Sequence, residues 1–132
     1  MISFDYNIKV YYKDIDKMGV VYYTRYLEYF EAARTEMLKS IGLIVTNIEN
    51  KGFFLPVVSA HCDYKQGANF EDEITIRTFI KEMPKARMKI EYEVLKDDIL
   101  LASGYTIHGF IDHDGKAKRP PKLFQQVMQE YF

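Results

Sequence analysis

Two hydrophobic periods divide this chain of 132 residues. From Tyr22 to Ile41 apolar side chains recur every three or four residues, which predicts one long amphipathic helix. Elsewhere the period is two, or the run is apolar nearly throughout, which predicts strands at Ile2–Tyr12, Phe53–Tyr64, Glu73–Lys81, Ala86–Val94 and Ile99–Ile111. We expect two shorter helices, one opened by a capping box at 46–49 and one after the proline pair at 120–121.

One long helix followed by a run of antiparallel strands predicts an α+β fold, as a single domain over residues 1–132. The helix has a broad apolar face, so we expect the sheet to curl around it. Phe53–Tyr64 has little polar surface and is expected to be a buried strand, with Pro56 marking a bulge or an edge. Because 15% of the residues are aromatic in so short a chain, we expect a second copy to cover part of the sheet.

Composition excludes several classes of protein. The net charge of −1 argues against a dedicated nucleic-acid binder. The single cysteine, Cys62, cannot form an internal disulfide, which fits a reducing compartment. Neither a signal peptide nor an apolar run near the ~20 residues of a membrane span is visible, so a cytoplasmic location is expected.

Candidate chemistry lies in the loop Asp14–Tyr23, which leads directly into the long helix. It places two acids and a glycine beside a helix N-terminus, whose free N–H groups bind an oxyanion, so the loop suits acyl transfer. For Asp16 the alternative is a capping or turn aspartate, and Asp14 is expected to shape the loop as an Asx turn. No histidine or further acid stands at ligand spacing, so no metal site is expected.

The residues DIDKMGVVY at 14–22 and YLEYFEAARTE at 26–36 closely resemble the hotdog-fold acyl-CoA thioesterases of the 4-hydroxybenzoyl-CoA thioesterase class, in particular the YbgC-like branch. Further matches at 63–65, 70–74 and 119–121 extend the likeness over essentially the whole chain. The resemblance implies a hotdog fold, in which a curved antiparallel sheet wraps a long central helix. It also implies hydrolysis of an acyl-CoA thioester by a homo-oligomer, at least a dimer and often a tetramer, with active sites at the dimer interface.

The same resemblance assigns roles within the loop. Asp16 corresponds to the catalytic carboxylate, either as nucleophile or as general base, and the backbone N–H of Tyr23 polarises the thioester carbonyl. Many YbgC-like members carry histidine where this chain has Tyr23, so any role of that imidazole is absent here. No metal and no separate cofactor are implied, since coenzyme A is part of the substrate.

Two further groups are candidates for substrate contacts. The first is the turn and the aromatic side chains beside it, Gly19, Val20, Val21, Tyr22 and Tyr26. The tyrosines have the alternative of being core, because they recur at helical spacing. The second is a basic set that suits the phosphates of coenzyme A, with a solvated strand face as its alternative: Lys85, Arg87, Lys89 and Arg119.

Other readings stay open at this point. Glu31 is expected to pair with Arg34 or a sheet residue, and the alternative is an auxiliary acid near the thioester. A non-catalytic module that holds acyl-CoA or acyl carrier protein is the alternative function. A dehydratase ranks low, because the loop holds no histidine. The sequence does not identify the acyl group.

Overall fold

The computed structural model describes all residues from 1 to 132 and has the predicted α+β architecture. Five antiparallel strands form one sheet in the order β1-β3-β4-β5-β2. The strands are β1 (Ile2–Lys9), β2 (Val57–Tyr64), β3 (Glu73–Ile80), β4 (Met88–Lys96) and β5 (Ile99–His108). The helices are the 3-10 turn η1 (Tyr12–Asp14), α1 (Arg25–Ser40), α2 (Val45–Asn50) and α3 (Lys122–Gln129). None of the helices is long and apolar enough to cross a membrane.

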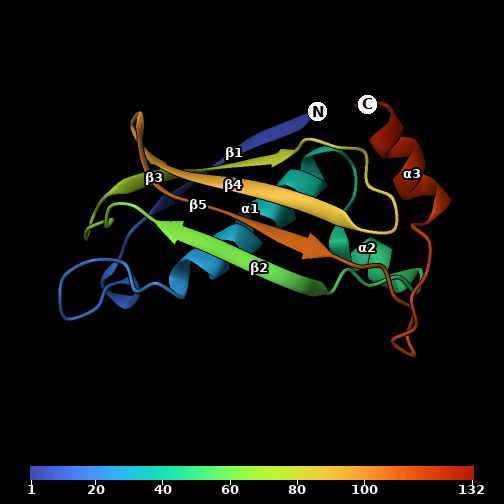
Figure 1. Cartoon of the computed structure of the whole chain (residues 1–132), viewed down its shortest axis with the longest axis horizontal. Coiled ribbons are helices and arrows are strands. Elements are labelled where there is room, and N and C mark those ends of the chain that lie inside the picture. Colours follow the sequence, from blue (N-terminus) through green and yellow to red (C-terminus); the bar gives the residue numbers. More distant parts are fainter.

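The sheet lies along α1, which confirms that the long helix is the centre of the fold (Figure 1). Alternate side chains of β3 and β4 are buried beneath it, as the period of two predicts. At the centre the ring of Phe30 on α1 stacks on Tyr92 of β4, with 4.1 Å between centroids and 5° between planes. Gly104 of β5 permits this packing, because a Cβ there would lie 2.9 Å from Cε2 of Phe30.

The expectation that Phe53–Tyr64 is a buried strand is wrong. Only Val57–Tyr64 is a strand, and β2 lies at the edge of the sheet with β5 as its one neighbour. Val58 and Tyr64 are each 48% exposed. The bulge or edge expected at Pro56 is confirmed, since the register of β2 shifts between Val57 and Ser59.

Element boundaries also differ from the sequence pattern, and the strand expected at Ile99–Ile111 ends at His108. The first strand ends at Lys9, and the chain then forms η1, in which the buried Asp14 carboxylate accepts a hydrogen bond from the backbone of Tyr11. The capping box at 46–49 is not formed: α2 begins at Val45 after Ile44, which caps nothing with its side chain.

A chain of buried polar groups crosses the core between β4 and β5. The Tyr92 hydroxyl lies 2.6 Å from Oγ1 of Thr106, which lies 2.9 Å from Nε2 of His108. Nδ1 of His108 lies 3.2 Å from the carbonyl oxygen of Leu55. Because a carbonyl only accepts, Nδ1 carries the proton, Nε2 accepts from Thr106, and Thr106 accepts from Tyr92. Burial lowers the pKa of His108 to about 4, so the imidazole is neutral and the chain of bonds has one direction.

This histidine predicts a specific loss of stability in acid. The unfolded chain takes up the His108 proton near pH 6.5 and the folded chain near pH 4, so the free energy of unfolding falls as pH drops through that window. The expected loss from this one group is about 3 kcal/mol. Denaturant unfolding at pH 7.0 and 4.5 measures it. In His108→Gln the slope with pH over this interval should flatten, and an unchanged slope would assign the acid sensitivity to other groups.

Candidate active site

The loop between η1 and α1 is a small hairpin with Asp16 at its turn. Ile15 and Val21 pair as an antiparallel bridge, and the backbone N–H of Asp16 donates to the Val20 carbonyl at 2.9 Å. Gly19 closes the turn with φ +81, a conformation that glycine adopts without strain. Oδ1 of Asp16 accepts the Met18 N–H at 2.8 Å, while Oδ2 has no partner within the chain. One carboxylate oxygen therefore shapes the turn and the other is free.

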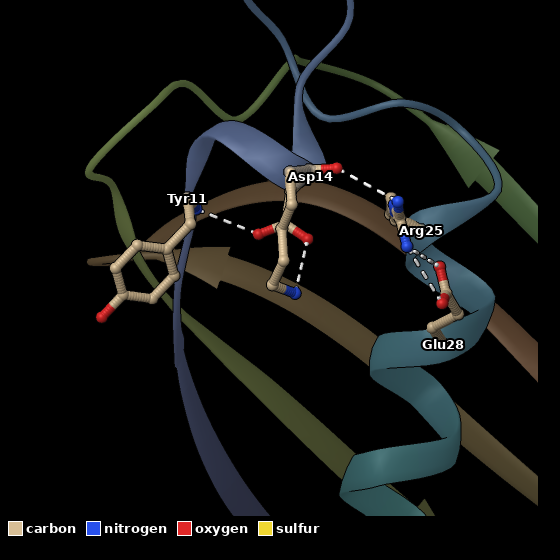
Figure 2. Close-up of polar contacts among 5 residues, drawn as sticks. Tyr11, Asp14, Arg25 and Glu28 are labelled. Atoms are coloured by element: carbon tan, nitrogen blue, oxygen red, sulfur yellow. Dashed lines mark hydrogen bonds and ion pairs between the residues drawn. The ribbon is translucent and has the colours of Figure 1, made fainter.

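Asp14 has the opposite environment, because its side chain is only 2% exposed. Its carboxylate accepts from the Tyr11 N–H at 3.0 Å and from Nζ of Lys13 at 3.2 Å, and its carbonyl accepts the Tyr22 N–H at 2.8 Å. Figure 2 shows Asp14 between Tyr11 and Arg25, whose guanidinium binds the Lys13 carbonyl at 3.1 Å and pairs with Glu28. Asp14 thus connects the start of the loop, at Tyr11, to its end, at Tyr22.

A second tether holds the loop from the sheet side. The Val21 N–H donates to the Ala68 carbonyl at 2.9 Å, and Val20 forms a bridge with Asn69. Gly67 lies so close to Val20 that a Cβ on it would be 2.6 Å from Cγ1 of that side chain. The segment that leads from β2 to β3 therefore fixes the height of the hairpin above the sheet.

The chain enters α1 with unused donors. The N–H groups of Tyr23 and Thr24 donate to no group within the chain, and the Thr24 side chain does not cap the helix. The Tyr23 carbonyl accepts a hydrogen bond from the Tyr64 hydroxyl at 2.9 Å. The N–H of Tyr22, the residue just before these amides, donates to the Asp14 carbonyl and closes the hairpin. The two free N–H groups and the Asp16 turn therefore belong to one short, closed segment.

The structure separates the candidate aromatic contacts. Tyr22 and Tyr23 are exposed at 45% and 57%, and the pKa of Tyr22 is raised chiefly by Tyr23 and to a smaller extent by the nearby Asp16 carboxylate. Tyr26 is 2% exposed and packs edge-on against Tyr29 and Tyr64. In the single chain Tyr26 is therefore core, as the helical spacing allowed, and supports the wall of the site rather than its surface.

The basic candidates lie at the other end of the molecule. Lys85 and Arg119 line one cavity of about 380 Å³ between the β3–β4 turn and the segment before α3, with Lys118 beside them. Arg87 follows in the same turn, and the ammonium of Lys89 lies 4.8 Å from the centroid of the Tyr105 ring on the outer face of the sheet. The Asp16 hairpin contacts Asn69, just before β3 begins, whereas the β3–β4 turn that carries Lys85 follows the end of β3. The length of β3, about 25 Å of extended strand, therefore separates the hairpin from the basic residues within one chain.

No ion pair joins Glu31 to Arg34 or to a sheet residue, so that expectation is wrong. Both side chains instead line a cavity of about 160 Å³ with Thr35 and the buried His108. No group of three His, Cys, Asp or Glu side chains is gathered anywhere in the chain in a way that could hold a metal ion.

Sequence reasoning missed two residues that hold the site, Tyr64 and Ala68. Both act through hydrogen bonds to the loop backbone, one through a side-chain hydroxyl and one through a carbonyl. Tyr64 lies in the segment 63–65, which contributes to the family resemblance, and this was the sequence signal that could have singled it out. Nothing in its local pattern identifies the Tyr23 carbonyl as its partner.

Comparison with known proteins identifies the family and the fold of the chain. The family model of the thioesterase-like superfamily matches residues 10–132. The acyl-CoA thioesterase YbgC of Haemophilus influenzae is 32% identical over 98% of this chain and 94% of its own length. A crystal structure of a hypothetical protein from Thermus thermophilus superposes with a TM-score of 0.92 at 30% identity, covering 99% of this chain and 98% of that one.

A 1,4-dihydroxy-2-naphthoyl-CoA thioesterase from Synechocystis superposes with a TM-score of 0.88 at 29% identity, covering 97% of this chain and 96% of that one. These similarities extend over the helix, the sheet and the loop alike, and they confirm the hotdog fold that the sequence predicted. The chain belongs to the thioesterase-like superfamily, within its 4-hydroxybenzoyl-CoA thioesterase type.

Proposed function

We propose that this protein hydrolyses acyl-CoA thioesters to a free acid and coenzyme A, with Asp16 as the reacting carboxylate. The observation that carries the proposal is the free Oδ2 of Asp16 in a short hairpin that ends at two unused backbone N–H groups. Membership of a thioesterase superfamily and the names of the relatives support the same reaction class.

Two routes fit a single carboxylate. As a nucleophile, Oδ2 attacks the thioester carbonyl, the C–S bond breaks, coenzyme A leaves as its thiol after protonation, and water then hydrolyses the mixed anhydride. As a general base, the carboxylate takes a proton from water as the water oxygen attacks the same carbon. The C–S bond of the tetrahedral intermediate then breaks, and the coenzyme A thiolate leaves as its thiol by taking that proton from the Asp16 carboxyl group. Both routes pass through a tetrahedral oxyanion. The Tyr23 N–H at the start of α1 is the proposed donor to it, aided by the positive end of the helix dipole.

The turn around Asp16 has the substrate-facing role in this proposal. Gly19 and Val20 present backbone and a small apolar side chain beside the carboxylate, and Tyr22 is the exposed aromatic group next to it. The Val21 side chain is only 5% exposed and belongs to the core, so the expectation that it contacts substrate is wrong for the side chain in the single chain. Tyr26 acts from behind as a buried support of this wall. The acyl group itself is left to a panel of short, long and aromatic thioesters.

Replacing Asp16 by asparagine should lower kcat by at least ~10², because the amide is neither a competent nucleophile nor a base. Asp16 is partly exposed, so the fold should persist, as circular dichroism and thermal unfolding would establish. Release of free thiol from acyl-CoA measures the rate. Turnover close to wild type in a well-folded Asp16→Asn protein would remove Asp16 from the chemistry.

Asp14→Asn is the matched control, two residues away in the same loop. Its carboxylate is buried and hydrogen-bonded, so the substitution should cost more stability and less activity than Asp16→Asn.

Wild-type protein that binds acyl-CoA and releases no thiol from any acyl group would instead identify a binding module for acyl-CoA or acyl carrier protein.

We propose further that the phosphates of coenzyme A bind the basic set, with Lys85 and Arg119 at the cavity they share, Arg87 in the same turn as Lys85, and Lys89 on β4. Phosphate contacts are made equally in the ground and transition states. Charge removal should therefore raise KM for acyl-CoA with little change in kcat.

The test compares Lys85→Ala and Arg119→Ala on acyl-CoA and on an acyl-N-acetylcysteamine thioester, which lacks the nucleotide phosphates. KM should rise on acyl-CoA alone, and added salt should weaken the same contacts. Lys81→Ala is a matched control, because Lys81 is an exposed lysine outside the proposed set, paired with Glu91 at 3.6 Å. An equal loss on both substrates would show that these residues do not read the nucleotide.

Association of two copies through β2 would bring the separated halves of this site together. β2 is an unpaired edge whose Tyr64 end lies at the loop and whose Val57 end lies toward the basic cavity. Antiparallel pairing of two such edges reverses the second chain end for end. The basic cavity of one copy then approaches the Asp16 hairpin of the other.

Light scattering at micromolar concentration should therefore give at least a dimer. Val58→Lys places a charge on the free edge and should shift the protein toward monomer with a loss of activity. Ile99→Lys is a matched control, because Ile99 is 51% exposed at the β4–β5 turn and Val58 is 48% exposed. A monomeric wild type with full activity would exclude a site shared between copies.

A further inference from the structure

Tyr64 connects the edge of the sheet to the start of α1. Its hydroxyl donates to the carbonyl oxygen of Tyr23 at 2.9 Å, across 41 positions of sequence. The contact lies at the end of β2 and meets the chain between the Asp16 hairpin and the helix. It is the one side-chain hydrogen bond that the backbone of residues 22–24 receives.

A bond to this carbonyl also fixes an N–H group. Every peptide in the chain is trans, so the N–H of Thr24 points opposite to the Tyr23 carbonyl within one plane. That N–H has no acceptor in the chain, and neither has the N–H of Tyr23 before it. The direction of the Thr24 donor is therefore set by where Tyr64 holds the carbonyl.

The Tyr64 side chain is itself well held. Its ring packs edge-on against Tyr26, with 5.3 Å between centroids and 72° between planes, and against Tyr23 at 6.4 Å and 87°. Tyr26 is buried, so it gives the Tyr64 ring a fixed wall. Desolvation and the neighbouring Cys62 raise the pKa of Tyr64 to about 12, and the hydroxyl keeps its proton in neutral and mildly basic solution.

We propose that Tyr64 is a positioning residue for thioester hydrolysis: it orients the Tyr23–Thr24 peptide so that the Thr24 N–H joins the Tyr23 N–H in stabilising the oxyanion. The inference rests on the proposed function and deepens it, because it adds a second backbone donor and the side chain that aims it. Tyr64 acts through the peptide and contacts no reacting atom. It leaves the thioester substrate and the role of Asp16 as proposed above.

Tyr64→Phe removes the hydroxyl and keeps the ring that packs on Tyr26. Loss of a whole oxyanion donor lowers kcat by about 10² to 10³, and loosening the orientation of one should lower kcat by about tenfold. KM for acyl-CoA and the melting temperature should stay near wild type, since the bond is a single exposed contact. A fall in melting temperature with kcat unchanged would assign the hydroxyl to the fold alone and overturn the proposal.

Tyr105→Phe is the matched control. Tyr105 lies on β5, next to β2, where its ring stacks on His61 and its hydroxyl makes no hydrogen bond within the chain. Its loss should leave kcat unchanged. Amide hydrogen exchange at Arg25 and Leu27, whose N–H groups donate to the Tyr22 and Thr24 carbonyls, gives a readout independent of activity when followed by NMR. Exchange should quicken in Tyr64→Phe and remain as in wild type in Tyr105→Phe.

The outcomes separate this inference from the function beneath it. If Asp16→Asn loses turnover while Tyr64→Phe keeps the wild-type kcat and exchange rates, the thioesterase mechanism stands and the role of Tyr64 is overturned. If wild-type protein hydrolyses no thioester, both are overturned together. A selective loss of kcat with faster exchange at the start of α1 supports both.

Discussion

The seating of α1 on the sheet is the constraint on which the rest of the molecule depends. Phe30 stacks flat on Tyr92, and the absence of a side chain at Gly104 lets the helix approach β5. A helix so placed has no freedom to slide, because each apolar side chain fills a space of fixed shape. The position of its first residue, Arg25, is therefore fixed. The Arg25 guanidinium donates a hydrogen bond to the Lys13 carbonyl, and this bond attaches the start of the preceding loop to the helix.

The loop has little core of its own, so backbone hydrogen bonds hold it in place of packing. Asp14 is buried and both of its carboxylate oxygens accept hydrogen bonds, whereas in Asp16 one oxygen accepts a bond within its own turn and the other accepts none. Two acids separated by one residue thus have unlike surroundings, which is the arrangement expected when one carboxylate shapes a site and the other reacts. The segment around Ala68 supplies the remaining restraint from the sheet side.

The sequence predicted those elements whose burial follows from a local period. α1, β3 and β4 each bury one face, and their boundaries fall within two or three residues of the pattern. The burial of β2 was predicted wrongly, because strand order decides whether an apolar strand is central or at an edge, and no local pattern encodes that order. Likewise, Asp16 and the Tyr23 amide could be proposed from the family resemblance of one short segment, while the contact of Tyr64 with Tyr23 depends on how the whole sheet closes around the helix.

The same strand that the sequence misjudged would link the proposed assembly to the proposed chemistry. β2 presents an unpaired backbone edge along one side and carries Tyr64 at its end, bonded to the peptide that begins α1. β2 is paired on one side only, with β5, and the Tyr64 side chain at its end is held by Tyr26 and by the bond to Tyr23. Pairing of this edge with a second copy would restrict both ends of β2 at once. Association and the orientation of the Tyr23–Thr24 peptide would then be coupled equilibria, and by linkage whatever favoured the paired edge would also favour the oriented peptide.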